Sequence, residues 1–572
     1  MNSLADPTHE RTTRPHWLVA GNWVLTALIL VSSAAVARPL AAGAAIASAH
    51  PFATQAGVQI LSQGGNAFDA AVAVAATLAV VEPSGSGLGG GGFWMLHRAR
   101  DGREVMVDGR ERAPLAAHAD FFLDGAGRPL PGASIDGPLA AGIPGLPATL
   151  AHVAERYGAL PLSTTLQPAI AIARNGFAVG EAYCRAAARR EKALRQSPAA
   201  ARIFLDHGRP PRPGFRLVQT ELAHTLEALA EDGADGFYRG AVGADLVKGV
   251  RAAGGRWATE DLAAYRVIER EPLRGEYRGV RIVTAAPPGG GVVLLETLNI
   301  LAEHELNRYP PPIATHVTIE AMRRAYRDRD RYLGDPDFIR IPLTRLLSRD
   351  YAAGLNAALR TDRALPSAYL PDAAAPEGDG ANTTHLSIVD REGNAVAATL
   401  SINYGFGSGF VAPGTGVLLN DEMDDFATLP GVPNVYGLVG GEANRVAPGK
   451  RMLSSMTPTF LDDRGRFAVL GTPGGSRIIS MVLLATLDFA DGRGPHWIAS
   501  RPRFHHQYLP DQVELEPDAL PAGDRTQLTA LGHRLQPLER PYGNLQIVVR
   551  ERDGRLSAAS DPRGEGLSIV IP

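Results

Sequence analysis

A change in composition near residue 383 constrains the fold of this 572-residue chain more than any other feature of its sequence. Residues 365–382 (LPSAYLPDAAAPEGDGAN) contain proline, alanine, glycine and acidic residues without a hydrophobic period, which is typical of an exposed flexible segment. Strand-forming residues begin immediately afterwards, at Thr383, and continue to Asp390. We therefore expect a flexible segment to end directly at the first residue of a β-strand.

The residues that follow predict a β-hairpin. Residues 391–393 (REG) suit a three-residue loop with glycine last, and residues 394–402 are again rich in strand-forming side chains. Pairing across this loop places Thr383 opposite Ser401, with Cβ atoms about 4.5–5.5 Å apart, and the two-residue period puts Asn403 on the same face. On its own, such a cluster of hydroxyl and amide groups is more common as a hydrogen-bonded strand end than as an active site.

The composition is that of a globular protein without a nucleic-acid partner. Hydrophobic residues make up 45% of the chain and charged residues 20%, so a large core can form. A net charge of -3 offers no single-sign field for phosphates, and the lone Cys184 excludes an internal disulfide and a thiolate metal cluster. We predict no metal ion and no other cofactor, because His505-His506 lack a third ligand at suitable spacing and are interpreted as structural or surface residues.

The N-terminus predicts an export signal over residues 1–37. Trp17–Ala37 is mostly apolar, Arg11 and Arg14 form a weakly basic region before it, and residues 35–37 (AVA) have the small-x-small form of a cleavage site. The alternative is an uncleaved anchor, since about 20 apolar residues suffice to span a bilayer. Either way we expect the rest of the protein to lie in the periplasm or outside the cell, with membrane contact only through an uncleaved N-terminal segment.

Two helices and a glycine-rich turn are expected next. Residues 52–61 and 67–80 have helical composition, and Asn66 can cap the second helix. Residues 85–90 (GSGLGG) match the spacing of a dinucleotide fingerprint. That motif requires a preceding strand and a following helix, whereas these glycines follow a helix and run into an apolar stretch. We interpret them as a tight structural turn.

Further along, residues 139–359 are mainly helical in pattern, and the many charges of residues 316–333 are interpreted as a solvated helix face. Residues 467–470 predict a buried strand and residues 478–486 a helix. The intervening glycines of residues 471–475 (GTPGG) suit either a plain strand–helix turn or a turn whose backbone N–H groups stabilise an oxyanion.

Several segments, taken together, resemble the γ-glutamyltranspeptidase family of N-terminal nucleophile hydrolases, from Ala44 to about Gly564. The resembling segments are GGNAFDAA (64–71), VEP (81–83), RERAP (110–114), YLGDP (332–336), TTH (383–385), LNDEMDDF (419–426), PGVPN (430–434), LSSM (453–456) and PGGSR (473–477). The resemblance implies an α/β fold, a four-layer αββα sandwich that two chains form jointly after autoproteolysis.

The resemblance also implies self-cleavage between Asn382 and Thr383. Residues 38–382 would become a large subunit and residues 383–572 a small subunit, together forming one composite catalytic domain over 38–572. Thr383 would then be both the nucleophile and, through its new α-amino group, the base. An α-amine with a pKa near 7.7–8 can take the proton of a threonine hydroxyl, whereas a peptide nitrogen cannot.

The remaining site residues follow from the same resemblance. Ser401 would orient Thr383, and the backbone of Gly474 and Gly475 would form the oxyanion hole. Substrate-binding roles are implied for Arg110, Ser454 and Ser455 at an α-carboxylate, for Asn403, Glu422 and Asp425 at an α-ammonium, and for Tyr436 in a lid over residues 430–444. Composition alone would place Arg110 and the acidic run on the solvated surface. Ser401 stands where many family members have threonine, and Met452 where a proline is common.

The implied activity is γ-glutamyl transfer and hydrolysis, in which a glutathione-like donor acylates Thr383 and water or an amino acid or peptide acceptor removes the acyl group. One alternative is a glutaryl-cephalosporin-type acylase, whose substrate lacks the α-ammonium; Glu422 and Asp425 argue against it. Another is a non-catalytic scaffold, which the presence of Thr383 disfavours.

Overall fold

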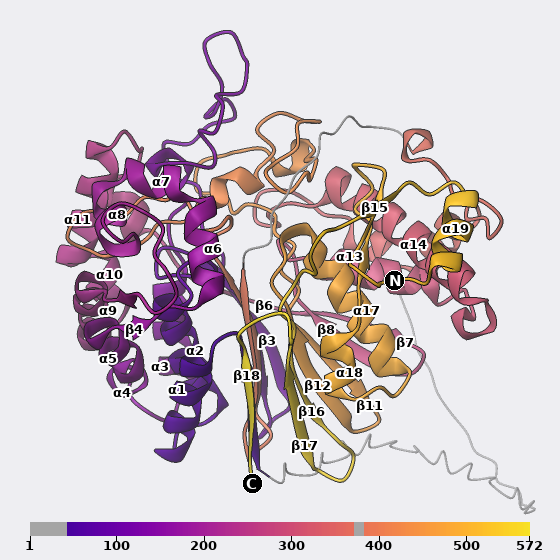
Figure 1. Ribbon diagram of the computed structural model, residues 1–572, viewed down its shortest axis with the longest axis horizontal. Coiled ribbons are helices and arrows are strands. Elements are labelled where there is room, and N and C mark those ends of the chain that lie inside the picture. The colour runs from indigo at the N-terminus through magenta and orange to yellow at the C-terminus, as the bar shows by residue number, and fades with distance from the viewer. Residues whose placement is uncertain (1–42, 371–382) are drawn as a thin grey trace, which may run out of the picture. The chain divides into compact units, whose positions relative to one another are not determined.

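Two antiparallel β-sheets pack face to face in the computed structural model, which describes residues 43–370 and 383–572 (Figure 1). The seven-stranded sheet has the order β18-β1-β9-β10-β2-β3-β6, and the six-stranded sheet the order β17-β16-β12-β11-β8-β7. The predicted export signal and residues 371–382 lie outside the described residues. The strands of the first sheet are β18 (Leu567–Ile571), β1 (Ala44–Ser48), β9 (Thr384–Val389), β10 (Ala395–Ser401), β2 (Gly91–Arg98), β3 (Arg103–Gly109) and β6 (Ile268–Arg270). Those of the second are β17 (Leu556–Ser560), β16 (Gln546–Arg550), β12 (Arg466–Gly471), β11 (Thr459–Asp463), β8 (Val280–Thr284) and β7 (Leu273–Tyr277).

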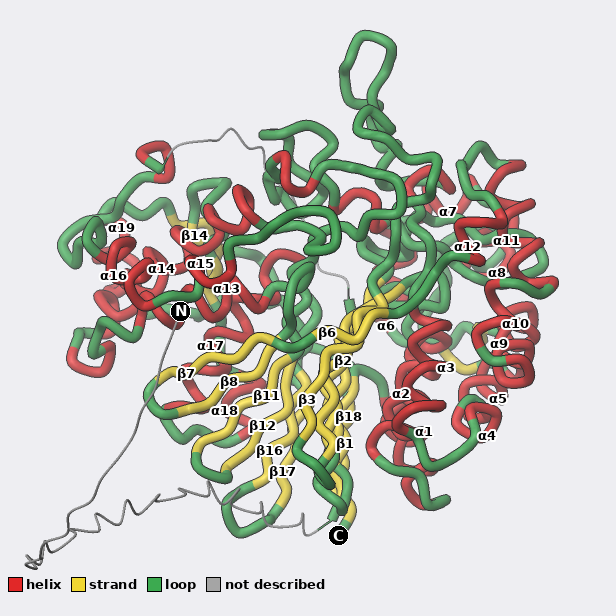
Figure 2. Tube along the Cα trace, turned by 180° about the vertical axis from the view of Figure 1, so that it is seen from behind, coloured by secondary structure: helices red, strands yellow, loops and turns green. Residues whose placement is uncertain are grey.

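Helices cover the outer face of each sheet, which gives the predicted four-layer αββα architecture (Figures 1 and 2). On the seven-stranded sheet lie α1 (Pro51–Ser62), α2 (Ala67–Val81) and α3 (Leu146–Tyr157), with α4 (Leu162–Thr165), α5 (Gln167–Asn175), α6 (Glu181–Arg189), α7 (Glu191–Gln196), α8 (Pro198–Phe204), α9 (Thr220–Asp232), α10 (Ala234–Tyr238), α11 (Ala241–Ala252) and α12 (Thr259–Ala263) around them. Beside the six-stranded sheet lie α13 (Gly291–Leu301), α14 (Pro311–Tyr332), α15 (Leu343–Leu346), α16 (Arg349–Asn356), α17 (Ile478–Ala490), α18 (Pro495–Ser500) and α19 (Ala522–Ala530). The short strands β4 (Phe177–Ala178), β5 (Arg216–Leu217), β13 (Phe504–His505), β14 (Val513–Leu515) and β15 (Leu535–Pro537) form two small sheets.

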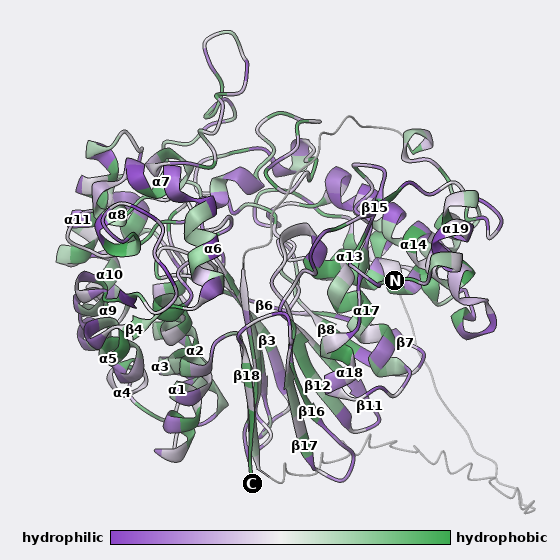
Figure 3. Cartoon of the chain, viewed as in Figure 1, coloured by the Kyte–Doolittle hydropathy of each residue, from purple (hydrophilic) through white to green (hydrophobic). Residues whose placement is uncertain are grey.

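Local sequence explains the elements that were predicted. Asn66 caps α2 in a capping box with Asp69, and all residues of α2 are buried because it is built from alanine, valine and other small or apolar residues. The glycines of residues 85–90 form a turn between α2 and β2, as predicted. The strands and their covering helices are mainly hydrophobic (Figure 3), because each sheet buries apolar side chains against its helices and against the other sheet.

The predicted hairpin is confirmed, including its register. Thr399 pairs with His385 and Leu400 with Thr384, so the same register carries Thr383 to the position opposite Ser401. The hairpin lies in the centre of its sheet, between β1 and β2. Strand β12 and helix α17 likewise form where the sequence predicts them, with a short 3-10 turn at Gly475–Arg477 between them.

The interpretation of residues 316–333 as a solvated helix face is wrong. The charged residues Glu320, Arg323, Arg324, Asp328 and Arg329 of α14 are all buried. Glu320 Oε2 accepts from Arg324 at 2.7 Å and Glu320 Oε1 from Arg323 at 3.1 Å. Glu320 pairs with both arginines within the helix, Arg323 also contacts Asp511 and donates to Ser367 Oγ at 2.6 Å, and the rest of the fold covers these side chains.

The expected exposed segment is also anchored over its first residues. Ser367 is fully buried, and its hydroxyl donates to Tyr508 O at 2.7 Å while accepting from Arg323 at 2.6 Å. Leu370 O accepts from the Tyr508 hydroxyl at 2.7 Å. Residues 365–370 are therefore anchored at Ser367 and Leu370, in contrast to the predicted flexibility, whereas Pro366, Ala368 and Tyr369 are exposed as predicted.

Residues Pro39–Pro572 group as one compact unit. Both large sheets contain strands from before and after residue 382, so the two halves of the chain share their ladders. Within the part of the chain that the structure describes, no helix has both the length and the apolar composition needed to cross a bilayer.

Candidate active site

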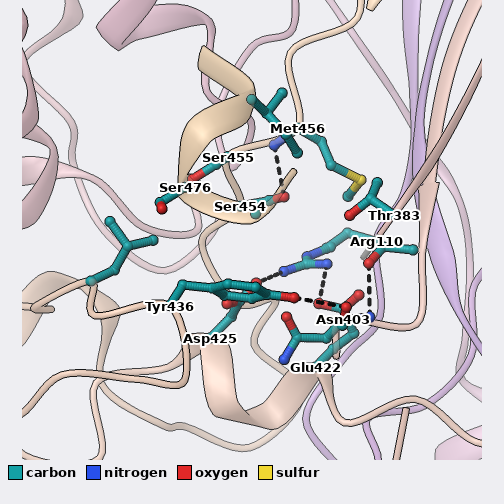
Figure 4. Close-up of a pocket in the computed structure, with 14 residues that line it drawn as sticks. Arg110, Thr383, Asn403, Glu422, Asp425, Tyr436, Ser454, Ser455, Met456 and Ser476 are labelled. Atoms are coloured by element: carbon teal, nitrogen blue, oxygen red, sulfur yellow. Dashed lines mark hydrogen bonds and ion pairs between the residues drawn. The ribbon is translucent and has the colours of Figure 1, made fainter. Parts of the chain in front are cut away.

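Nearly all of the predicted site residues line one small pocket (Figure 4). They are Arg110, Thr383, Ser401, Asn403, Glu422, Asp425, Tyr436, Ser454, Ser455 and Gly475. Gly474 is not among the lining residues, and Asn382 lies outside the described residues. The pocket holds about 20 Å³ of free space, which is roughly the room of one water molecule. The side chains around Thr383 therefore leave little free space between them.

Thr383 is brought to the pocket by the central hairpin. It directly precedes β9 and is 6% exposed, while Ser401 ends β10 and is 4% exposed. Ser401 Oγ accepts from the backbone N–H of Asn403 at 2.7 Å. Asn403 has φ 69°, in the left-handed region that asparagine tolerates, and its side-chain amide donates to Asp421 O at 3.0 Å. This turn ends β10 and keeps the amide at the pocket.

His385 lies two residues behind Thr383 and was not singled out from the sequence. It is fully buried, with Nδ1 2.8 Å from Thr399 Oγ1 and Nε2 3.1 Å from Ser387 Oγ. Burial lowers the pKa of His385 to about 3, so the imidazole is neutral. A Cβ at Gly471 would lie 2.3 Å from His385 Cε1, so only glycine lets β12 approach this ring. Sequence could not reveal this contact because it joins two different sheets.

Arg110 forms the charged centre of the pocket. Its guanidinium donates to Glu422 Oε2 at 2.5 Å and to Asp425 Oδ2 at 2.5 Å, and Glu111 Oε2 lies 3.4 Å away. Arg110, Glu111 and Glu422 are each 1% exposed or less, so the surface position that composition alone predicts for Arg110 and Glu422 is wrong. One buried cation thus faces three carboxyl groups.

This imbalance shifts the pKa values of the group. Burial alone would lower the pKa of Arg110, but the carboxylates of Glu422, Glu111 and Asp425 hold it above its usual value. Burial raises the pKa of Glu422 to about 7, although Arg110 opposes the change. Burial raises the pKa of Glu111 well above its usual range, and the nearby negative charge of Glu422 adds to this effect. At neutral pH the cluster therefore retains protons that exposed carboxylates would have lost.

Tyr436, which belongs to the predicted lid, lines the pocket. Its hydroxyl donates to Asn403 O at 2.7 Å, and a Cβ at Gly475 would lie 2.6 Å from its Cδ1 atom (Figure 4). Gly475 has φ 57°, which also favours glycine. The ring therefore rests directly on the predicted oxyanion turn, and only a residue without a side chain fits beneath it.

Ser454 and Ser455 form another part of the pocket wall. Ser454 N–H donates to Pro288 O at 2.8 Å, and Ser454 Oγ accepts from Met456 N–H at 3.1 Å. Ser455 Oγ accepts from the guanidinium of Arg329 at 3.2 Å. Arg329 belongs to the charged stretch of α14, and no sequence signal distinguished it from its neighbours.

Comparisons with known proteins agree with this geometry. A model of the family described as γ-glutamyltranspeptidase matches residues 53–571. The chain belongs to the γ-glutamyltranspeptidase family. It is 43% identical over 514 residues to a glutathione hydrolase proenzyme from Pseudomonas sp. (strain A14), covering 89% of each chain. It is 42% identical over 524 residues to the glutathione hydrolase proenzyme of Escherichia coli (strain K12), covering 91% of this chain and 90% of the other. Among solved structures, a cephalosporin acylase from Bacillus halodurans has a TM-score of 0.82 at 29% identity, covering 93% of this chain and 96% of that chain.

Membership of the γ-glutamyltranspeptidase family confirms the predicted resemblance, the fold class and the assignment as an enzyme of the N-terminal nucleophile type. The individual roles of the site residues stay predictions. What the structure adds is that residues from distant parts of the chain, predicted only by resemblance, meet around Thr383.

Buried histidines elsewhere in this family member form a separate polar network. Among the described residues, His316, Glu320 and His533 are a group whose ligand atoms lie within 4.8 Å of one another. His316 Nδ1 is 2.7 Å from His533 Nε2, and both Glu320 oxygens accept from arginines. Neighbouring arginines oppose the addition of a dication, so we interpret the group as structural. His505 and His506 are also buried and hydrogen-bonded, so of the two predicted interpretations the structural one holds.

Proposed function

We propose that this protein is a γ-glutamyltranspeptidase and glutathione hydrolase that uses Thr383 as an N-terminal nucleophile. The observation that carries the proposal is the placement of Thr383 in one pocket with Arg110, Glu422 and Asp425. An α-amino acid head group carries one carboxylate and one ammonium. A pocket with one guanidinium and several carboxyl groups complements both charges.

The first step is self-cleavage. The Thr383 hydroxyl attacks the carbonyl carbon of Asn382, the peptide C–N bond breaks, and its nitrogen takes a proton to become the α-amine. Water then hydrolyses the resulting ester, giving the Asn382 carboxylate and restoring the hydroxyl. The products are the large subunit, 38–382, and the small subunit, 383–572. The relatives from Pseudomonas sp. (strain A14) and Escherichia coli are both named as proenzymes, which supports this step.

The second step is acyl transfer. The new α-amine takes the proton of the Thr383 hydroxyl, whose oxygen attacks the γ-carbonyl of the donor, and the leaving amine receives that proton. Ser401 orients the hydroxyl, and backbone N–H groups of Gly474 and Gly475 stabilise the tetrahedral oxyanion. Water or the amine of an amino acid or peptide acceptor then releases the γ-glutamyl group.

Substrate binding separates charges that the empty pocket pairs internally. Arg110 contacts Glu422 and Asp425 directly in this structure. A γ-glutamyl head group would insert its ammonium toward Asn403 and those two carboxylates, and its carboxylate toward Arg110, Ser454 and Ser455. Each original charge keeps a partner, so binding exchanges ion pairs instead of leaving a buried charge unpaired. Tyr436 lines the same pocket, and we expect its ring to shift outward as the head group enters, because the free space between the side chains is small.

Export completes the proposal. Residues 1–37 would direct the protein to the periplasm or the cell exterior, either removed as a signal or retained as an anchor. The substrates would be small γ-glutamyl amides such as glutathione, with amino acids or peptides as acceptors.

Self-cleavage is tested on a denaturing gel of the purified protein. We expect two bands, with the smaller beginning Thr383-Thr384-His385, and one uncut band for Thr383→Ala. A wild-type protein that stays intact over time would contradict the mechanism.

Substrate class is tested with two chromogenic anilides. We expect rapid release from the γ-glutamyl anilide and slow release from the glutaryl anilide, which lacks the α-ammonium. Equal rates would favour the acylase alternative, for which the similarity to a cephalosporin acylase structure is the supporting observation.

A further inference from the structure

Helix α14 contacts two walls of the pocket from behind. The Tyr326 hydroxyl donates to Ser476 O at 2.6 Å, and one turn later Arg329 donates to Ser455 Oγ at 3.2 Å. Ser455 and Ser476 line the pocket, whereas Arg329 does not. Figure 4 shows Ser455 and Ser476 near each other at the pocket. Arg329 therefore lies behind the pocket wall and contacts it through the hydroxyl of Ser455.

The charge of Arg329 is only weakly compensated. Its side chain is 5% exposed, its closest carboxylate atom is Asp330 Oδ1 at 3.5 Å, and its Nε has no hydrogen-bond partner among the described residues. Burial raises the pKa of Asp330 to about 8, against the influence of Arg329, so this neighbour carries little negative charge at neutral pH. A buried guanidinium without full compensation is costly, which suggests that it serves an anion.

Arg110, by contrast, is already neutralised in the empty pocket. It contacts Glu422 and Asp425 at 2.5 Å each, with Glu111 close by. A substrate carboxylate approaching Arg110 therefore meets a cation surrounded by carboxyl groups. Positive potential from a second, less compensated arginine would favour the carboxylate at this end of the pocket.

The hydrogen bond from Arg329 also fixes what Ser455 can do. Once Ser455 Oγ accepts from the guanidinium, its own hydrogen is free to be donated to a third group. A hydroxyl that accepts a charge-assisted hydrogen bond is polarised and becomes a stronger donor itself. The arrangement Arg329 N–H to Ser455 O–H to carboxylate is therefore cooperative.

We propose that Arg329 is a positioning residue for the carboxylate of the substrate and acts through the hydroxyl of Ser455. This inference rests on the proposed γ-glutamyl specificity of the pocket and assigns to the large-subunit helix α14 a part in recognising one end of the donor. The inference predicts that loss of Arg329 weakens turnover of substrates that carry the carboxylate and leaves turnover of substrates without it nearly unchanged.

The test uses three anilides that differ only in the head group. The γ-glutamyl anilide has carboxylate and ammonium, the glutaryl anilide only the carboxylate, and the 4-aminobutanoyl anilide only the ammonium. For Arg329→Met we expect the KM of the γ-glutamyl and glutaryl anilides to rise about tenfold or more, because one charge-assisted hydrogen bond is lost. The kcat/KM of the 4-aminobutanoyl anilide should change less than about twofold. Arg329→Lys, which keeps the charge and one donor, should recover part of the loss. Arg331→Met on the exposed side of α14 is the matched control and should leave all three unchanged.

A second variant guards against misfolding. Ser455→Ala should produce the same selective rise in KM, and adding Arg329→Lys to it should cause no further rise, because the two residues act in one chain. Equal losses on all three anilides, no loss on any, or additive effects in the double variant would overturn the inference. If the proposed function is wrong, the wild-type protein will not turn over the γ-glutamyl anilide. If only this inference is wrong, the wild-type protein will turn it over, and the ratio of the variant KM to the wild-type KM will not depend on the carboxylate. Wild-type turnover of none of the three would overturn both.

Discussion

At the scale of single residues, the surroundings of Thr383 depend on close contacts between the two sheets. His385 lies two residues after Thr383, the proposed nucleophile, and Gly471 of the facing sheet approaches its ring so closely that a Cβ atom would lie 2.3 Å from Cε1. Both ring nitrogens of His385 are hydrogen-bonded, to the hydroxyls of Thr399 and Ser387, and these bonds fix the orientation of the ring. The position of Thr383 therefore relies on a residue with no proposed chemical role.

Gly471→Ala should destabilise the protein by about 1–3 kcal/mol, because the added methyl group overpacks the core against His385. Urea denaturation followed by fluorescence measures the change in the free energy of unfolding. Gly354→Ala is the control: it lies in α16, with no atom within 4 Å of the added methyl group, and should be neutral or slightly stabilising. Equal stability of both variants would contradict the packing argument.

The raised pKa of Glu422 predicts a pH dependence of substrate binding. Burial raises this pKa to about 7, so the residue is mostly protonated below pH 7 and mostly ionised above it. Only the ionised form attracts the substrate ammonium. The KM for a γ-glutamyl anilide should therefore fall about tenfold between pH 6 and pH 8, and this dependence should flatten in Glu422→Gln. A wild-type KM that is constant over this range would contradict the assignment.

At the scale of elements, α14 shows how a charged helix becomes part of a core. Glu320 lies between Arg323 and Arg324, and the side chains of all three are nearly inaccessible to solvent. The same helix reaches the pocket through Tyr326 and Arg329. Its charges thus stabilise buried packing on one stretch and contact the active-site walls on the next.

Glu320→Gln should destabilise the protein by about 3–5 kcal/mol, because it removes the carboxylate partner of the buried Arg324 and one of the two carboxylate partners of the buried Arg323, which keeps Asp511. The matched control is Glu305→Gln, which removes an exposed partner of Arg308 and should change stability little. Thermal unfolding of both variants and the wild-type protein measures the difference: the unfolding temperature should fall clearly for Glu320→Gln and little for Glu305→Gln. Similar unfolding temperatures for both would show that burial does not govern the cost.

At the scale of the whole molecule, the two proposed subunits interleave. In the seven-stranded sheet, β9 and β10 lie between β1 and β2, and in the six-stranded sheet β11 pairs with β8. The proposed cleavage point therefore precedes a strand held by ladders from both sides. Neither segment can complete a sheet without the other.

The two products should consequently stay together after cleavage. With an affinity tag on the C-terminus only, we expect both subunits to co-purify under native conditions and to separate only in denaturant. Residues 383–572 produced alone should fail to fold, as judged by proteolysis. A small subunit that is stable by itself would contradict the interleaved architecture.

The sequence by itself determined the features that depend on neighbours in the chain. The hairpin register of β9 and β10, the Asn66 cap of α2 and the strand–turn–helix around Gly475 all follow from periodicity and turn chemistry over a few residues. Motifs in the sequence also identified the family and, through it, the residues that line the pocket.

Tertiary structure alone decided which charges are buried and what they contact. Arg110, the charged stretch of α14 and Ser367 all have the composition of exposed segments, yet each is buried against partners far away in the sequence. The physical reason is that burial of a charge is favourable only when distant groups compensate it, and local composition carries no record of those groups. The link from Arg329 to Ser455, and the space that His385 takes from Gly471, exist only once the layers are packed together.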